Sequence, residues 1–252
     1  MTPRDPVAAH SLLAGKRVLI TAAAGSGIGS ATARRCVEEG ATVMISDRHE
    51  RRLGQAATEL GVASVPCDVT DETSVQAMFA AALDMLGGID VMVNNAGLGG
   101  TANVHEMTDE QWSTVLDVTL TGTFRCLRAA LGVMYAAGHG IVVNNASVVG
   151  WRAQAGQAHY AAAKAGVMAL TRCAAIEAAP HGVRVNAVAP SIAMHANLAK
   201  VTSDELLAEL EAREAFGRSA EPWEVANVIV FLASDYSSYM TGEVVSVSSQ
   251  HP

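Results

Sequence analysis

The chain has 252 residues, of which 50% are hydrophobic but only 4% aromatic, and its formal net charge is −8. This length can bury one large α/β core, and the scarcity of aromatic residues favours a parallel sheet under closely packed helices over a β-sandwich. The acidic charge argues against a nucleic acid or an anionic membrane as partner, because both need a basic surface. We therefore expect a small-molecule substrate.

The N-terminal residues 1–14 contain two prolines and no sustained apolar stretch, so they are predicted to form a loose arm and not a secretory signal. No uninterrupted run of about 18 apolar residues predicts a membrane span. The four cysteines lie far apart, without a CxxC pair or a Cys/His cluster at metal-ligand spacing. We expect no metal site and a reducing, cytoplasmic location.

From residue 15 onward, short β-branched runs alternate with longer alanine-rich stretches of helical pattern. The predicted strands are 16–21, 41–46, 63–67, 89–94, 140–146, 183–188 and 243–248. Helix-start signals at Asp71-Glu72 and Thr108-Asp109-Glu110 lie between them. The alternation predicts a single Rossmann-like α/β domain over 15–252, with a doubly wound, parallel, seven-stranded sheet. Residues 191–214 lack a strand pattern and are expected to form a substrate loop over the carboxyl edge of that sheet.

A glycine-rich turn joins the first predicted strand to the helix that follows it. Glycines there let a pyrophosphate approach the backbone, and the helix N-terminus offers free N–H groups and a partial positive charge. The glycines alone leave two interpretations open, a dinucleotide site and an ordinary turn. On the first interpretation, the cofactor contacts are Ala23, Gly25, Ser26, Gly27, Ile28 and Gly29.

The second predicted strand leads into Asp47, at about the distance from the turn at which an acidic side chain meets the adenosine ribose. A carboxylate there accepts hydrogen bonds from the ribose hydroxyls and repels a 2′-phosphate. Arg48 follows directly, and its guanidinium could instead accommodate a 2′-phosphate or simply lie in solvent. NAD is the expected cofactor, with NADP as the alternative.

Tyr160 and Lys164 are about one turn apart in an alanine-rich helical stretch, so both project from one helix face. A phenol with the ordinary pKa of about 10 is a poor base at neutral pH, but a nearby ammonium and a positive nicotinamide ring favour the phenolate. Tyr160 can then remove the proton of a substrate alcohol as hydride leaves, or return it in the reductive direction. An isolated pair of this kind is more often structural, so the assignment depends on the surrounding motifs.

Several motifs together resemble the short-chain dehydrogenase/reductase family over about residues 15–247. They are the glycine-rich turn, Cys67-Asp68-Val69, Asn94-Asn95-Ala96-Gly97, Ser147, Tyr160-Ala-Ala-Ala-Lys164 and Arg184-Val-Asn186-Ala-Val-Ala-Pro190. The resemblance implies that Ser147 holds the reacting oxygen and that Lys164 also bonds the nicotinamide ribose. It also implies a homo-oligomer, a tetramer or a dimer. Further cofactor contacts implied by the family pattern are Asp68, Val69, Asn95, Ala96, Gly97, Tyr160, Lys164, Pro190 and Ile192.

Three positions depart from the family pattern. Ala22 stands where the first glycine after the threonine is usual, and the loop is one residue longer. Thr119 replaces an asparagine whose carbonyl holds a water in a proton relay and whose side chain supports a helix distortion. Thr119 keeps the carbonyl and is retained as a candidate catalytic residue. His195 replaces a threonine expected beside the cofactor, and it could bond phosphate, face the substrate or be a surface histidine.

Trp151 and Arg152 follow Ser147 and are candidates for the substrate entrance, where an arginine suits a carboxylate or CoA phosphates; an ordinary surface pair is equally consistent. Stretches 20–35, 147–154, 214–226 and 246–252 resemble an actinobacterial branch of the family that oxidises a ring hydroxyl on a bicyclic acyl-CoA in steroid breakdown.

The expected function is hydride transfer between a nicotinamide cofactor and a bulky secondary alcohol or ketone, such as a ring-hydroxylated acyl-CoA. One alternative is a 3-oxoacyl thioester reductase of fatty-acid synthesis, against which Asp47 argues. The other is a nucleotide-binding protein without turnover, which Thr119 and the altered glycine loop motivate.

Overall fold

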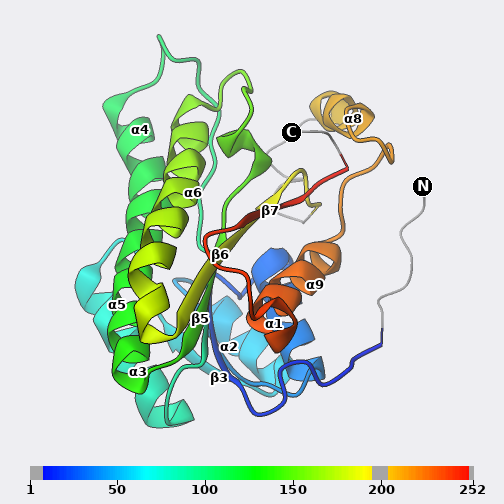
Figure 1. Ribbon diagram of the computed structural model, residues 1–252. Coiled ribbons are helices and arrows are strands. Elements are labelled where there is room, and N and C mark those ends of the chain that lie inside the picture. The colour runs from blue at the N-terminus through cyan, green and yellow to red at the C-terminus, as the bar shows by residue number, and fades with distance from the viewer. Residues whose placement is uncertain (1–7, 195–203, 250–252) are drawn as a thin grey trace.

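The computed structural model describes residues 8–194 and 204–249 of the chain (Figure 1). The strands in these ranges are β1 (Arg17–Thr21), β2 (Thr42–Asp47), β3 (Ala63–Pro66), β4 (Val91–Asn94), β5 (Gly140–Asn145), β6 (Val183–Pro190) and β7 (Val244–Val247). The α-helices are α1 (Ile28–Glu38), α2 (Glu50–Leu60), α3 (Glu72–Leu86), α4 (Asp109–Leu116), α5 (Gly122–Ala137), α6 (Ala158–Ala178), α8 (Asp204–Ala212) and α9 (Pro222–Ala233). Shorter turns are the π-helical η1 (Asp117–Thr121) and the 3-10 turns η2 (Val148–Gly150), η3 (Ala179–His181) and η4 (Asp235–Ser237).

The described strands form one parallel sheet in the order β3-β2-β1-β4-β5-β6-β7. Each predicted strand is present, with ends that differ by at most two residues, so the predicted doubly wound, seven-stranded fold is confirmed. From β1 the chain adds β2 and β3 on one side of the sheet, and it then returns to add β4, β5, β6 and β7 on the other side. This reversal opens a crevice at the carboxyl ends of β1 and β4, where ligands bind in such sheets.

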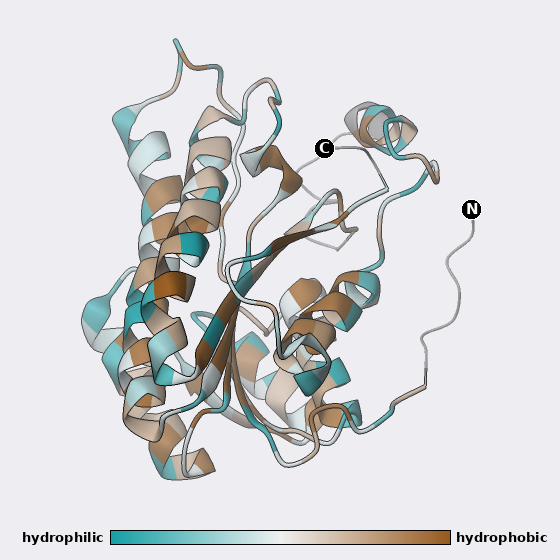
Figure 2. Ribbon diagram, viewed as in Figure 1, coloured by the Kyte–Doolittle hydropathy of each residue, from teal (hydrophilic) through white to brown (hydrophobic). Residues whose placement is uncertain are grey.

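Helices cover both faces of the sheet: α1, α2 and α9 lie on one side, and α3, α5 and α6 on the other (Figure 1). Successive residues of β1 point to opposite faces. Val18 and Ile20 belong to the core cluster that contains Ile229 of α9, whereas Leu19 belongs to the cluster that contains Leu127 of α5. Because both faces are buried, the central strands are mostly hydrophobic (Figure 2), and the polar residues of β4 and β5 lie at their carboxyl ends.

The two helix-start signals read from the sequence are present as caps. The Asp71 carboxylate accepts a hydrogen bond from Thr73 N at the start of α3. Thr108 and Gln111 form a capping box at the start of α4, in which each side chain accepts from the other residue's backbone N–H. These caps fix where both helices begin.

The described part of the N-terminal arm is packed against the domain and is not loose. Leu13 is fully buried in the core beside α1, and the backbone N–H groups of His10 and Leu12 both donate to the Glu39 carboxylate. Glu39 is itself buried at the end of α1. A polar residue at a helix end gave no sign in the sequence that it would hold a distant segment.

The predicted substrate loop 191–214 contains a helix, α8, in its second half. Before it, Ala193 pairs with Ala220, and Met194 N donates to Ala220 O. His195 lies outside the described residues. None of the described helices is both long and apolar enough to span a membrane. Within residues 8–194 and 204–249, no three His, Cys, Asp or Glu side chains gather in a group suited to a metal ion.

Candidate active site

Ser147, Tyr160 and Lys164 lie together at the carboxyl end of β5. Ser147 is buried at the start of η2, and its hydroxyl donates to Pro190 O at 3.4 Å and accepts from Val149 N at 3.3 Å. The Ser147 hydroxyl is also near enough to the Tyr160 hydroxyl to lower the pKa of Tyr160. The Lys164 ammonium lies 5.5 Å from the centre of the Tyr160 ring. The structure therefore brings the three predicted catalytic side chains into one cluster.

Close packing between η2 and α6 makes this meeting possible. A Cβ on Gly150 would lie 2.8 Å from Met168 Cε and 3.0 Å from Ala165 N, so only glycine lets the Ser147 turn approach α6 this closely. The alanine-rich sequence of α6 has the same effect, because small side chains allow helix and turn backbones to come together. Backbone proximity thus sets the distance between Ser147 and Tyr160.

Burial shifts both titratable groups of the cluster toward their neutral forms. Burial of its hydroxyl end raises the pKa of Tyr160 to about 12, and the nearby Ser147 hydroxyl opposes that rise. Burial lowers the pKa of Lys164 to about 8. The phenol is therefore protonated at neutral pH in the free protein, and it becomes a base only when additional positive charge comes close to it.

The glycine-rich turn after β1 has the geometry of a phosphate cradle. Gly27 caps α1 without a side-chain hydrogen bond, and the first turn of α1 carries no acidic residue, so its N–H groups face outward unscreened. A Cβ on Gly29 would lie 2.4 Å from Asn95 Nδ2 and 2.5 Å from Ala22 O. Ala22 adopts a left-handed backbone with φ 51, which costs a non-glycine residue about 1–2 kcal/mol. The loop thus keeps its shape at the position where the usual glycine is missing.

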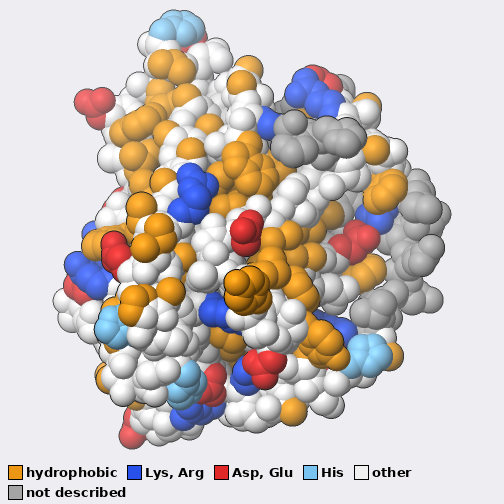
Figure 3. Space-filling model, viewed as in Figure 1, with side chains coloured by type: hydrophobic (Ala, Val, Ile, Leu, Met, Phe, Trp, Pro, Cys, Tyr) orange, Lys and Arg blue, Asp and Glu red, His pale blue; other side chains and the backbone are white. Residues whose placement is uncertain are grey.

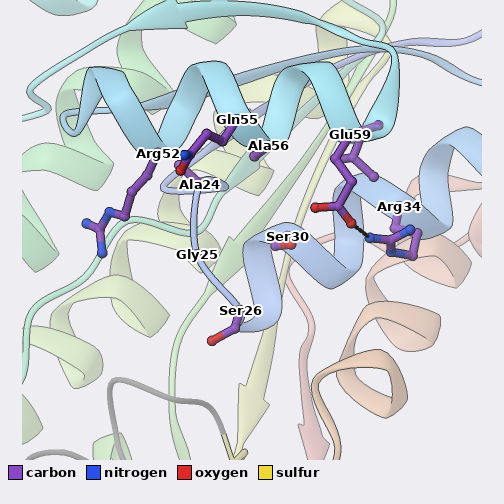
Figure 4. A pocket seen from close by; sticks show the side chains of 10 residues that line it. Ala24, Gly25, Ser26, Ser30, Arg34, Arg52, Gln55, Ala56 and Glu59 are labelled. Atoms are coloured by element: carbon purple, nitrogen blue, oxygen red, sulfur yellow. Dashed lines mark hydrogen bonds and ion pairs between the residues drawn. The ribbon is translucent and has the colours of Figure 1, made fainter.

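Asp47 lies at the end of β2, directly beside this turn. One carboxylate oxygen accepts from Ala24 N at 3.2 Å and the other from His49 N at 3.0 Å. Arg48 is exposed. A cavity of about 300 Å³ opens between α1 and α2, where Ser26 and Gln55 lie on facing walls (Figure 4). Ala24 lines this cavity and also joins the turn to Asp47 through its backbone N–H.

Asp68 and Val69 follow β3 at the same edge. Hydrogen bonds from the backbone N–H and hydroxyl of Thr70 hold the pKa of Asp68 below its ordinary value. Val69 is buried under α5, because a Cβ on Gly122 would lie 2.7 Å from Val69 Cγ2. Arg125 donates to Val69 O at 3.4 Å.

Thr119 lies in the π-helical turn η1, which separates α4 from α5. Its hydroxyl accepts from Leu98 N at 3.0 Å and donates to Leu98 O at 3.1 Å. Its carbonyl accepts from the Thr123 hydroxyl at 2.8 Å. One buried hydroxyl therefore makes both bonds to the loop after β4, and the helix distortion is present without asparagine.

An amide network that the sequence analysis overlooked connects the glycine turn to Lys164. Asn95 Nδ2 donates to Thr21 O and Ala22 O, and Asn145 Nδ2 donates to Asn95 Oδ1 at 2.9 Å. Lys164 Nζ donates to Asn145 O at 2.5 Å. The available signal was the asparagine doublet 144–145 at the end of a buried parallel strand, where apolar residues are usual.

The remaining sequence candidates lie around the same opening. Gly97 adjoins Lys164, since a Cβ there would lie 3.4 Å from Lys164 Nζ. Ile192 is held by a bond from Ala220 N to its carbonyl. Trp151 is 42% exposed, and the backbone N–H of Arg152 donates to Val148 O. Gly97 thus adjoins the cluster at Lys164, whereas Trp151 and Arg152 follow the Ser147 turn.

Comparisons with known proteins agree with this architecture. The family model described as "Enoyl-(Acyl carrier protein) reductase" matches residues 22–249. A solved short chain dehydrogenase from Mycobacterium smegmatis is 56% identical with a TM-score of 0.90, covering 100% of this chain and 99% of that one. The chain belongs to the short-chain dehydrogenase family. It is therefore an oxidoreductase, and its family binds a nicotinamide cofactor, NAD or NADP.

Two curated members of the short-chain dehydrogenase family are similar to this chain over most of their length. A Mycobacterium tuberculosis protein named (5R,7aS)-5-hydroxy-7a-methyl-1-oxo-2,3,5,6,7,7a-hexahydro-1H-indene-carboxyl-CoA reductase is 63% identical over 259 residues, covering 100% of this chain and 98% of that protein. Cis-4-hydroxycyclohexanecarboxylate dehydrogenase from Sinomonas cyclohexanicum is 43% identical over 237 residues, covering 92% and 95%. Both names describe a hydroxyl on a carbon ring that also bears a carboxyl group or its thioester.

Proposed function

We propose that this chain transfers hydride between NAD(H) and a ring-bearing secondary alcohol or its ketone, with Ser147, Tyr160 and Lys164 as catalytic residues. The observation that carries the proposal is the cluster of these three side chains at the sheet edge that also holds an uncapped helix N-terminus. A base and a phosphate cradle on the same edge are the two parts that nicotinamide-dependent alcohol oxidation requires.

The chemistry of each residue follows from its contacts. Ser147 exchanges its bond to Pro190 O for one to the substrate oxygen. The alcohol gives its O–H proton to Tyr160 and its C–H hydride to the cofactor, which leaves a ketone; reduction reverses both transfers. The nicotinamide ring, when bound, supplies the hydride acceptor and, in its oxidised form, a positive charge. Lys164 favours the phenolate, and the Thr119 carbonyl, which retains a second lone pair, is the candidate for the proton relay.

The fit of a dinucleotide is supported by the free N–H groups of α1 and by the lack of room for a side chain at Gly29. Residues that would surround the pyrophosphate and adenosine are Ala23, Gly25, Ser26, Gly27, Ile28, Gly29, Asp47, Arg48, Asp68 and Val69. Residues that would surround the nicotinamide half are Asn95, Ala96, Gly97, Tyr160, Lys164, Pro190 and Ile192.

NAD is proposed over NADP because of the position of Asp47. Its carboxylate is anchored to the glycine turn through Ala24 N, where it would meet the ribose hydroxyls and repel a 2′-phosphate. Arg48 is exposed and has space to move. Its guanidinium could bind a 2′-phosphate, which is the argument for NADP. Thermal unfolding with each cofactor distinguishes NAD from NADP.

The proposed substrate is a ring-hydroxylated acyl-CoA. Support comes from the names of the two relatives, which share a ring hydroxyl and a carboxyl or carboxyl-CoA group. Trp151 and Arg152 beside the Ser147 turn would suit an apolar ring and an anionic group, respectively. A second candidate, reduction of acyl-carrier thioesters with NADPH, has support from the description of the matching family model.

The proposed setting is the cytoplasm, as a homo-oligomer. Free thiols at all four cysteines support a reducing compartment. Exposed apolar side chains on α4, α5 and α6 support association of copies, and orange patches cover that part of the surface (Figure 3).

Thermal unfolding with NADH and with NADPH tests the cofactor assignment. A ligand at 100 times its Kd adds about 2.7 kcal/mol of stability, which shifts the midpoint of a chain of this size by roughly 5–10 °C. We expect NADH to give this shift and NADPH a smaller one. A larger shift with NADPH would favour the thioester reductase, and no shift with either would contradict the proposed function.

A further inference from the structure

Asn145 occupies a junction between the two halves of the site. Its backbone carbonyl accepts from Lys164 Nζ, and its side-chain amide donates to Asn95 Oδ1. Asn95 in turn donates to the carbonyls of Thr21 and Ala22, at the beginning of the glycine turn. A continuous chain of hydrogen bonds thus leads from the lysine that is proposed to face the nicotinamide ribose to the loop that is proposed to hold the pyrophosphate.

The direction of the amide bonds in this chain is fixed by its far end. Asn95 Nδ2 lies against two carbonyl oxygens, so that atom must be the nitrogen and Asn95 Oδ1 must be an acceptor. Asn145 must then present its nitrogen to Asn95. No carboxylate or apolar side chain at position 145 could make this bond.

The amide of Asn145 also carries a cost to folding. Its Oδ1 is buried and has no hydrogen-bond partner among the described residues. A buried acceptor without a partner destabilises the folded state, whereas an apolar strand residue at this position would leave no such atom. Stability alone therefore does not account for asparagine at position 145.

The segment that Asn95 holds is the strained part of the glycine turn. Ala22 has a left-handed backbone, a conformation that persists only when its surroundings impose it. Asn95 Nδ2 fills the space beside Ala22 O and Gly29. If Asn95 rotates, Ala22 is freed to relax and the beginning of α1 loses its packing partner.

We propose that Asn145 is a positioning residue that holds the dinucleotide loop in register with Lys164, acting through Asn95. The inference rests on the proposed function and adds to it a residue that touches neither substrate nor cofactor. It predicts that changes at position 145 weaken cofactor binding more than they weaken the fold.

Two substitutions at position 145 distinguish the effect of losing the amide N–H donor from the effect of shortening the side chain. Asn145→Asp keeps the shape but presents an acceptor to Asn95 Oδ1, and Asn145→Ser is too short to reach it. From the loss of one hydrogen bond we expect the NADH Kd to rise about fivefold in Asn145→Ser, and further in Asn145→Asp because two acceptors then face each other. The KM for the alcohol should change less than the KM for NAD.

Asn144→Ser is the matched control. Asn144 precedes Asn145 in β5 and also makes a 2.9 Å bond to an asparagine, Asn94, but its own amide donates to Thr171 inside the core. This variant should lose thermal stability and keep an NADH Kd within about twofold of the wild type, because its bonds do not reach the loop.

We would measure the Kd of NADH and NADPH by calorimetric titration of the purified full chain and of every variant. Melting curves of the same proteins give their thermal stability. A rise in Kd at position 145 without a rise at position 144 supports the proposal. Unchanged Kd values in both position 145 variants, or an equal rise in Asn144→Ser, would overturn it while leaving the proposed function intact. If the wild type binds neither cofactor, the proposed function fails and this inference fails with it.

Discussion

At the scale of one residue, burial of the Lys164 ammonium in the candidate active site lowers the stability of the fold. Its side chain is 3% exposed, and burial lowers its pKa from 10.5 to about 8. Between these two values the unfolded chain binds more protons than the folded chain, so stability rises with pH over that window. Below pH 8 the cost of burying the ammonium is present in full.

Lys164→Met should therefore be more stable than the wild type at pH 7, by up to about 3 kcal/mol, less the value of the lost bond to Asn145 O. The difference should shrink as pH rises from 8 and vanish above 10.5. Urea unfolding at pH 7 and pH 10.5 measures it, with turnover expected to be lost at both. A methionine variant less stable than the wild type at pH 7 would contradict the burial argument.

Thr119 supports a second prediction at this scale, because its single hydroxyl makes both bonds to Leu98. Thr119→Val keeps the shape and removes both, so we expect a loss of about 1–3 kcal/mol of stability and a lower kcat. Thr119→Asn can make two bonds with its amide and should retain more activity. Equal kcat values for wild type and Thr119→Val would exclude a role for this hydroxyl in the site.

At the scale of elements, the connection from β1 to α1 leaves no room for a side chain at Gly29. Gly29→Ala would place a methyl group 2.5 Å from Ala22 O, a backbone atom that cannot move aside freely. We expect destabilisation of about 1–3 kcal/mol and at least tenfold weaker NADH binding, measured by melting and titration.

Gly54→Ala is the matched control for that change. Gly54 lies in the exposed middle of α2, and a Cβ at this position would have no neighbouring atom within 4 Å. Alanine there should add about 0.5–1 kcal/mol of stability, because it favours the helix and its methyl group clashes with no neighbouring atom. NADH binding should be unchanged. Similar losses of binding in both variants would show that Gly29 has no special role.

The elements also show what sequence patterns can and cannot predict. The hydrophobic runs predicted every described strand, and Asp71 and Thr108 predicted two helix starts, because period and capping are local properties. Two other features depend on residues that only the fold brings together, so no local pattern predicts them. They are the bond from Leu12 N to the Glu39 carboxylate and the bond from Asn145 to Asn95. The motif residues at the sheet edge were found because each motif ends a strand or starts a helix.

At the scale of the whole molecule, association of copies is the open architectural proposal. Trp112, Phe124 and Ile176 on α4, α5 and α6 are 42%, 41% and 77% exposed. An apolar surface shared by neighbouring helices is typical of an interface between identical subunits.

Ile176→Glu should therefore shift the mass measured by light scattering toward smaller species, because a charge buried in a helical interface is costly. Val37→Glu, on the opposite layer of the sheet, should leave the mass unchanged. A wild type that is monomeric at all concentrations would contradict the proposal.

The central claim is that Tyr160 transfers the proton during NAD-dependent oxidation of a ring-hydroxylated acyl-CoA. The most direct measurement is NADH production by the wild type and by Tyr160→Phe, with NADH affinity measured for both. We predict a loss of kcat of about 10²–10⁴-fold in the variant with little change in affinity. Turnover by Tyr160→Phe at the wild-type rate would contradict the claim.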